Sequence, residues 1–272
     1  MTELSPEMSV HVHDEEQVST RRYGELEVVV HQSAEALGRG AAGRAAAAIR
    51  KEVDSRGRAA VVLATGNSQR GFLASLTSFE LPWDKVSILH MDEYVGISED
   101  HPASFRRYLR EHIVEPVQPA AFYGIEGDAP DLEAELRRYE ALLRTQEPCL
   151  CVLGIGEKGH LAFNDPPADF HTTELVHEVT LDEACRRQQV GEGYFPDVAV
   201  VPARALSLTV PALLAPPTVI AVVPEARKAA AVRNTLEGPV SPACPASALR
   251  GAPNASLHLD PDSAGLLTAS RS

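Results

Sequence analysis

The stretch that decides the fold is CLCVLGIGEKGHLAFNDPP, which spans residues 149–167. It opens with an apolar run, CLCVL, that predicts a strand buried on both faces. A loop follows in which Gly154, Gly156 and Gly159 permit a tight backbone path close to a ligand, and His160 stands next to the last glycine. A buried strand that ends in such a loop is typical of a parallel sheet with its ligand at the carboxyl ends of the strands.

The same alternation of strand, loop and helix runs along the chain. Apolar runs predict strands at 26–30, 59–64, 86–91, 149–155, 197–201, 218–223 and 255–260. Helical spacing predicts helices at 33–50, 72–76, 100–116, 131–143, 181–190, within 205–214 and at 225–237. We therefore expect an α/β fold with a mostly parallel sheet flanked by helices on both faces. It forms a single domain over 25–272, after a flexible acidic leader at 1–24.

Composition narrows the function classes. The formal charge of −13 over 272 residues argues against a nucleic-acid surface and against an anionic membrane. The apolar runs are too short to span a bilayer, and the polar, acidic residues 1–20 do not resemble a signal peptide. The four cysteines, at 149, 151, 185 and 244, are expected to be buried free thiols. These features predict a cytoplasmic protein.

Polar side chains follow the strand predicted at 59–64. Gly66 lets the backbone approach a ligand, and Thr65, Asn67 and Ser68 offer donors beside the start of a helix. This combination suits a phosphate group, although an ordinary capped turn has the same composition.

Two carboxylates, Asp92 and Glu93, close the strand predicted at 86–91. Neighbours on a strand point to opposite faces, so one of them would face the site and the other would be structural. The one that faces the site would suit a general base, although helix capping or a salt bridge explains the pair equally well.

His160 precedes Asp165 by five residues, and Pro166 and Pro167 stiffen the end of the loop. A carboxylate that pairs with the imidazole would orient it and set its pKa. The alternative is a histidine with a purely structural role.

The motifs TGNS, MDEYVG followed by DHPASF, and GIGEKGHLAFNDP resemble those of glucosamine-6-phosphate deaminases. These belong to the glucosamine-6-phosphate isomerase and 6-phosphogluconolactonase superfamily. The resemblance continues through VPARALSLTVPALL, PEARKAAAV, CPASAL and LDPDSAG, and covers about residues 30–267. It implies a Rossmann-like fold and an enzyme that isomerises and deaminates an amino-sugar phosphate. The reaction would convert glucosamine 6-phosphate to fructose 6-phosphate and ammonia, with neither a metal nor an organic cofactor.

The resemblance also implies roles for individual residues. Asp92 would move a proton from C2 to C1 of the sugar, His160 would assist ring opening, and Asp165 would support His160. The loop Thr65–Ser68 would cradle the phosphate together with Lys228, while the backbone at Gly156 would wrap the sugar.

Three positions depart from the family pattern. The family has aspartate where this chain has Lys158, and FNEP where this chain has FNDP, which shortens Asp165 by one methylene. Lys158 would favour a neutral imidazole, and it would either contact a substrate anion or point to solvent. A count without gaps places Gln189 where the family has a phosphate-binding arginine, with Arg186 and Arg187 just before it.

Two other functions remain open at this point. One is a 6-phosphogluconolactonase, which the MDEYVG motif disfavours. The other is a non-catalytic sensor of a sugar phosphate, which Lys158 favours and the retention of Asp92 and His160 opposes. Family members differ in assembly, so a homo-oligomer is also left open.

Overall fold

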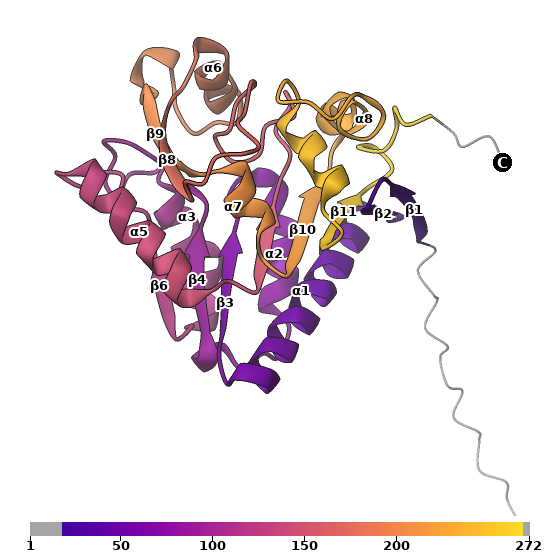
Figure 1. The fold of residues 1–272 in the computed structure, drawn as a ribbon, viewed down its shortest axis with the longest axis horizontal. Helices are drawn as coiled ribbons and strands as arrows, with labels where there is room; N and C mark the ends of the chain where they lie inside the picture. Colours follow the sequence, from indigo (N-terminus) through magenta and orange to yellow (C-terminus); the bar gives the residue numbers. More distant parts are fainter. Residues whose placement is uncertain (1–17, 269–272) are drawn as a thin grey trace, which may run out of the picture.

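The structure, a computed structural model, describes residues 18–268. Its centre is an eight-stranded sheet with the strand order β1-β2-β11-β10-β7-β3-β4-β6 (Figure 1). All neighbours in it are parallel except β1 and β2, which confirms the predicted mostly parallel sheet. The strands are β1 Ser19–Tyr23, β2 Leu26–Val30, β3 Ala59–Leu63, β4 Val86–His90, β6 Ala121–Tyr123, β7 Leu150–Leu153, β10 Thr218–Val223 and β11 Ala255–Leu259.

Helices cover both faces of this sheet. The helices are α1 Ala34–Arg56, α2 Arg70–Thr77, α3 Phe105–Leu109, α4 Glu115–Val117, α5 Leu132–Gln146, α6 Glu183–Gly191, α7 Val210–Leu214 and α8 Ala229–Glu237. A π-helical turn, Arg110–Val114, joins α3 to α4. Short 3-10 helices lie at Asn67–Gln69, Trp83–Lys85, Val198–Val200, Ala226–Lys228 and Pro245–Gly251.

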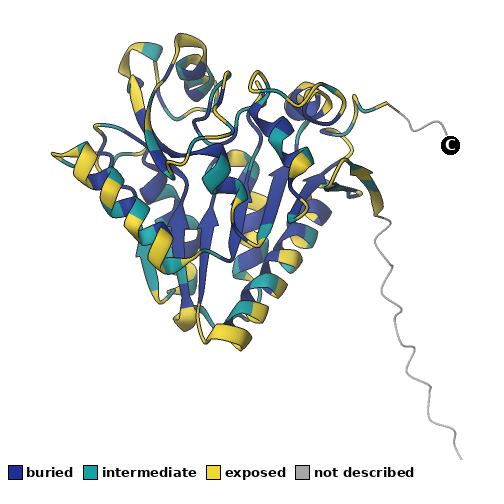
Figure 2. Cartoon of the chain, viewed as in Figure 1, coloured by how far each residue is buried: buried dark blue, intermediate teal, exposed yellow. Residues whose placement is uncertain are grey.

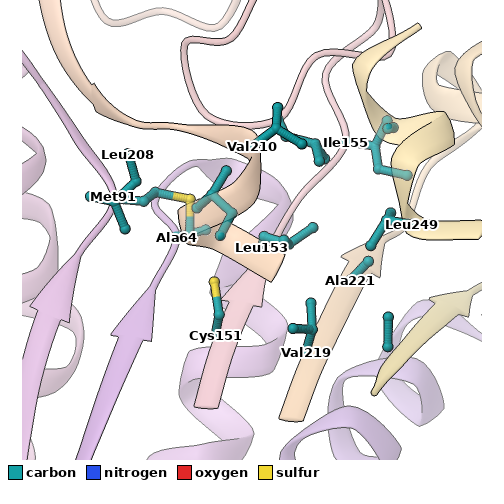
Figure 3. Close-up of a cluster of buried hydrophobic side chains, with 14 of the residues drawn as sticks. Ala64, Met91, Cys151, Leu153, Ile155, Leu208, Val210, Val219, Ala221 and Leu249 are labelled. Atoms are coloured by element: carbon teal, nitrogen blue, oxygen red, sulfur yellow. The ribbon is translucent and has the colours of Figure 1, made fainter. Parts of the chain in front are cut away.

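Alternate residues of each central strand belong to two separate hydrophobic clusters, one on each face of the sheet. In β7, Leu150 and Val152 pack with α1 and α2, while Cys151 and Leu153 pack with α5, α7 and α8. Figure 3 shows the second cluster, with Cys151 and Leu153 beside residues of β10. Figure 2 shows the central strands of the sheet buried and the outer sides of the helices exposed. Burial on both faces explains why these strands are continuous apolar runs.

A second, three-stranded antiparallel sheet lies above the carboxyl end of β4. Its order is β5 (Asp92–Tyr94), β9 (Arg204–Leu208) and β8 (Val176–Thr180). It packs with α6 on a third cluster that includes Tyr94, Phe105 and Phe195. The sequence analysis did not predict this sheet.

Three sequence predictions differ from the structure in this region. The helix predicted at 100–116 begins at Phe105, because the Glu93 carboxylate accepts hydrogen bonds from the Phe105 and Arg106 amides and fixes the helix start there. The strand predicted at 197–201 is a 3-10 turn, since the Asp197 side chain accepts from the Ala199 amide. The first half of 205–214 is β9, and only its second half is helical.

The predicted leader at 1–24 is too long at its carboxyl end. Ser19–Tyr23 forms β1 and pairs along its whole length with β2, so these residues belong to the sheet. Residues 1–17 of the predicted leader lie outside the described residues. Within residues 18–268 no helix is long and apolar enough to cross a membrane. All four cysteines are free, and all except the partly exposed Cys244 are buried, as predicted.

Candidate active site

The loops singled out in the sequence meet in one cavity. Strands β10, β7, β3 and β4 are consecutive and parallel, so their carboxyl ends share one edge of the sheet. The cavity at this edge encloses about 610 Å³, its open mouth included. It is lined by Ala64, Thr65, Gly66, Ser68, Met91, Asp92, Phe105, Gly154, Ile155, Gly156, His160, Ala162, Phe163, Gln188, Gln189, Glu192, Tyr194 and Lys228.

Asp92 and Glu93 separate as strand alternation requires. Asp92 lines the cavity, whereas Glu93 is fully buried on the other side of β5. The Glu93 carboxylate accepts hydrogen bonds from the Ser104 hydroxyl and from three backbone amides, at 2.8–3.2 Å. It also lies 3.5 Å from Nε of Arg106. Glu93 is therefore the structural member of the pair.

The Asp92 carboxyl has the electrostatics of a proton acceptor. It is 7% exposed, and burial, together with the neighbouring Glu93 charge, raises its pKa to about 8. A base with a pKa near the working pH combines a populated basic form with a strong driving force for proton transfer. A perturbed carboxyl in a cleft is also a common mark of a functional site.

The loop between β3 and α2 presents its backbone to the cavity. Gly66 has φ +107° and ψ 163°, a conformation that glycine adopts without strain. Its carbonyl accepts a hydrogen bond of 2.8 Å from the Tyr108 hydroxyl, which holds the loop in place. Thr65 and Ser68 line the cavity, but the exposed Asn67 does not. The Asn67 side-chain amide instead donates to the Glu192 carbonyl at 3.3 Å.

The loop after β7 is folded so that His160 can enter the cavity. A Cβ atom at Gly156 would lie 1.9 Å from Nε2 of His160, so only glycine leaves room for the imidazole. The Gly156 amide donates to the His160 carbonyl at 2.9 Å, which closes the loop. Gly159 has φ +79°, and a Cβ there would also meet Sγ of Cys244 at 2.8 Å. Gly156 and Gly159 are thus required by the geometry of this loop.

His160 and Asp165 lie side by side. Nδ1 of His160 is 3.3 Å from Oδ1 of Asp165, although neither atom has a hydrogen-bond partner of good geometry among the described residues. Burial, and secondarily the charges of Lys228 and Lys158, lowers the pKa of His160 to about 4. Burial raises the pKa of Asp165. The imidazole is therefore neutral near pH 7, and its Nε2 side faces Gly156.

Lys158 lies outside the cavity lining. Its side chain is 41% exposed, and its Nζ atom is 3.8 Å from Oδ2 of Asp182, the N-cap residue of α6. Of the eleven site residues that the sequence analysis named, Asn67, Lys158 and Asp165 do not line the cavity. Asp165 lies behind the cavity wall, beside the His160 ring.

Of residues 186–189, in the carboxyl-terminal half of α6, the two glutamines face the site. Gln188 and Gln189 line the cavity, and the buried Gln189 accepts a hydrogen bond from the Tyr94 hydroxyl. The exposed Arg187 pairs with Glu183 on the same helix. Lys228, at the start of the helical segment after β10, is 4% exposed and lines the cavity, and burial lowers its pKa.

Sequence reasoning missed several residues of the cavity wall. The main ones are Met91, Phe105, Phe163, Gln188, Glu192 and Tyr194. Phe163 lies inside the GHLAFN motif, which could have indicated it. Glu192 and Tyr194 follow α6 in a segment without a motif, so no sequence signal marked them.

Comparisons with known proteins identify the family of this chain. The family model described as glucosamine-6-phosphate isomerases/6-phosphogluconolactonase matches residues 32–257. Glucosamine-6-phosphate deaminase 1 of Bacillus subtilis (strain 168) is 33% identical over 248 residues, which cover 89% of this chain and 99% of that protein. The deaminase of Lactobacillus delbrueckii subsp. bulgaricus (strain ATCC BAA-365 / Lb-18) is 30% identical over 242 residues, covering 89% of this chain and all of the relative.

Solved structures of known proteins have the same fold. A structure described as a monomeric glucosamine-6-phosphate deaminase has a TM-score of 0.81 and 32% identity, and the match covers 88% of this chain and 99% of that one. A 6-phosphogluconolactonase from Shewanella baltica OS155 has a TM-score of 0.72 at 20% identity, covering 88% and 100%, which shows a shared fold. The chain belongs to the glucosamine-6-phosphate isomerase/6-phosphogluconolactonase family.

Proposed function

We propose that this protein is a glucosamine-6-phosphate deaminase, which converts glucosamine 6-phosphate and water to fructose 6-phosphate and ammonia. The observation that carries the proposal is that a buried carboxyl, Asp92, and a neutral imidazole, His160, line one cavity that also contains Lys228. The relatives that bear this name are similar over most of the chain.

Ring opening is assigned to His160. The imidazole takes the proton of the C1 hydroxyl and returns a proton to the ring oxygen as the C1–O5 bond breaks. A neutral imidazole can accept this proton, and the pKa of His160 keeps it neutral at pH 7. Asp165, 3.3 Å away, stabilises the imidazolium that forms.

Isomerisation is assigned to Asp92. Its carboxylate removes the proton at C2, which gives an enolamine, and delivers a proton to C1, which gives an imine at C2. Water then adds to the imine and ammonia leaves, so the ketone of fructose 6-phosphate forms. A single carboxylate can serve both carbons because they are adjacent and the substrate is held in one orientation.

Substrate orientation is assigned to the phosphate end of the cavity. Thr65, the Gly66 backbone and Ser68 offer neutral donors, and Lys228 offers a positive charge. Binding energy from the phosphate, which does not react, holds C1 and C2 against Asp92. Gln189 and the backbone at Gly156 complete the proposed contacts, whereas the positions of Asn67 and Lys158 favour supporting roles.

The test is to supply the purified protein with glucosamine 6-phosphate, 6-phosphogluconolactone or unphosphorylated glucosamine. Ammonia, fructose 6-phosphate and 6-phosphogluconate are measured in parallel. The proposal predicts equal amounts of ammonia and fructose 6-phosphate from the first substrate and no acceleration of lactone hydrolysis. Lactone hydrolysis alone would indicate the lactonase, and binding without turnover would indicate a sensor.

We further propose that the protein acts in the cytoplasm, where its four free cysteines would stay reduced. One solved relative is described as monomeric, so we expect a monomer of 29.2 kDa in solution. Sedimentation equilibrium at several concentrations tests this, and a concentration-dependent higher mass would instead support the homo-oligomer that the sequence left open.

A further inference from the structure

The end of the cavity near Lys228 contains a carboxylate. Glu192 lines the cavity, and its side chain is 13% exposed. Of the cavity-lining residues in the described chain, Lys228 is the one lysine or arginine. A phosphate dianion that binds Lys228 would therefore meet a negative charge in the same cavity.

Hydrogen bonds with Gln188 and Asn67 hold Glu192 at this position. Its Oε1 atom accepts a hydrogen bond of 3.1 Å from Nε2 of Gln188, one turn earlier on α6. Its backbone carbonyl accepts from Asn67, which ties it to the loop that carries Thr65 and Ser68. Burial lowers the pKa of Lys228, and Glu192 is the charge that opposes this lowering most. Glu192 thus contacts the loop after β3 and acts electrostatically on Lys228.

Arg227, the cation next to Lys228 in the sequence, is already paired with carboxylates. Arg227 precedes Lys228 but does not line the cavity. Its Nη1 atom lies 3.2 Å from Glu157 and 3.5 Å from Glu192, and its Nε atom is 2.5 Å from Glu225. Three carboxylates around one guanidinium leave no net positive charge for a ligand. At the position where Gln189 stands, the cavity has a neutral side chain as well.

We infer that Glu192 is a specificity-determining residue, whose carboxylate weakens the binding of a phosphate dianion beside Lys228. Lys228 and the neutral donors favour a phosphorylated amino sugar over an unphosphorylated one. The Glu192 carboxylate makes this preference weaker than it would be without that charge. The inference rests on the proposed function, since that function places the substrate phosphate at this end of the cavity. The Coulomb repulsion is little screened there because the site is largely buried.

The first test needs no catalysis. The dissociation constant of inorganic phosphate is measured by calorimetry for the wild type, Glu192→Gln and Glu157→Gln. Glu157→Gln is the matched control, since it removes a carboxylate from the same Arg227 but outside the cavity. We expect Glu192→Gln to bind phosphate about tenfold more tightly, equivalent to about 1.4 kcal/mol, and Glu157→Gln to change it less than about twofold.

Lys228→Met should abolish phosphate binding when it is added to the wild type and to Glu192→Gln. This result would place the measured site in this cavity. If Glu192→Gln is poorly folded, Glu192→Ser serves as the second variant, because it also removes the charge. Unchanged or weaker phosphate binding, an equal gain in Glu157→Gln, or no binding by any of these proteins would overturn the inference.

The second test uses turnover. The ratio of kcat/KM for glucosamine 6-phosphate to that for glucosamine should rise about tenfold in Glu192→Gln, and a ratio that falls would overturn the inference. Failure of the proposed function would show as no ammonia from any variant, while the phosphate measurements would still decide the role of Glu192.

Discussion

The imidazole of His160 occupies the space that a side chain at residue 156 would fill. A Cβ atom on Gly156 would come within 1.9 Å of Nε2 and 2.1 Å of Cε1 of that ring. The glycine-rich loop after β7 is therefore shaped by the position of the imidazole. This contact makes the role of His160 testable from a neighbouring residue.

Gly156→Ala should displace the His160 ring and lower kcat/KM by roughly 100-fold or more, since a shift of about 1 Å in a catalytic group has effects of that size. Steady-state kinetics and circular dichroism together measure the loss and confirm the fold. Gly251→Ala is the control, because nothing lies within 4 Å of a Cβ there. Similar activities of the two variants would contradict the assigned position of the ring.

The pH dependence of the reaction should follow Asp92. Its pKa is raised to about 8, so the carboxyl is mostly protonated below that pH and becomes a base above it. We expect kcat/KM to increase about tenfold per pH unit from pH 6 and to level off near pH 8. A profile that is already flat at pH 6 would mean that the essential base ionises at a normal carboxylate pKa.

Asp92 should also affect stability in a pH-dependent way. Its pKa is higher in the folded than in the unfolded chain, so the folded state binds the extra proton and stability falls as the pH rises from about 4 to about 8. Asp92→Asn removes this loss. The melting temperature of the variant should exceed that of the wild type by a margin that grows between pH 5 and pH 8, as scanning calorimetry would measure.

Glu93 is expected to matter for stability rather than for proton transfer. Glu93→Ala removes the acceptor of the amides at the start of α3 and one of the two carboxylates beside the buried Arg106, which should cost about 3 kcal/mol of unfolding free energy. Asp128→Ala is the matched control, since it removes the half-exposed partner of the same arginine. Urea denaturation that gave equal losses for both variants would contradict this assignment.

Lys158 should have little influence on turnover. It is 41% exposed and 3.8 Å from Asp182, and such pairs are typically worth below about 1 kcal/mol. Lys158→Met should change kcat/KM by no more than about fivefold, whereas Lys228→Met should raise KM far more. A large loss in Lys158→Met would show that this lysine reaches the substrate in the complex.

The main sheet could be predicted because its strands carry their own signal. β3, β7 and β10 are continuous apolar runs, and the loops after them hold part of the cavity lining. The small antiparallel sheet could not be predicted, since β5 has three residues and is defined by pairing with β9, more than a hundred residues later.

The site was predictable where a motif marks it and not where only tertiary contact does. Asp92, His160 and Lys228 stand in recognisable motifs, and all three line the cavity. Glu192 reaches the cavity because α6 folds back over the loop after β3, a relationship that no local pattern encodes. The hydrogen bond from Asn67 to the Glu192 carbonyl holds the Asn67 side chain outside the cavity lining. Its sequence neighbours Gly66 and Ser68 both line the cavity.

The most direct measurement is the rate of ammonia release from glucosamine 6-phosphate by the wild type and by Asp92→Asn at pH 8.5, where the wild-type carboxyl is ionised. Substrate binding by the variant is checked by thermal shift. The account predicts a loss of roughly 1,000-fold in kcat, in the range found for a missing general base, with binding retained. A variant that binds the substrate and keeps activity within tenfold of the wild type would contradict the central claim that Asp92 moves the proton.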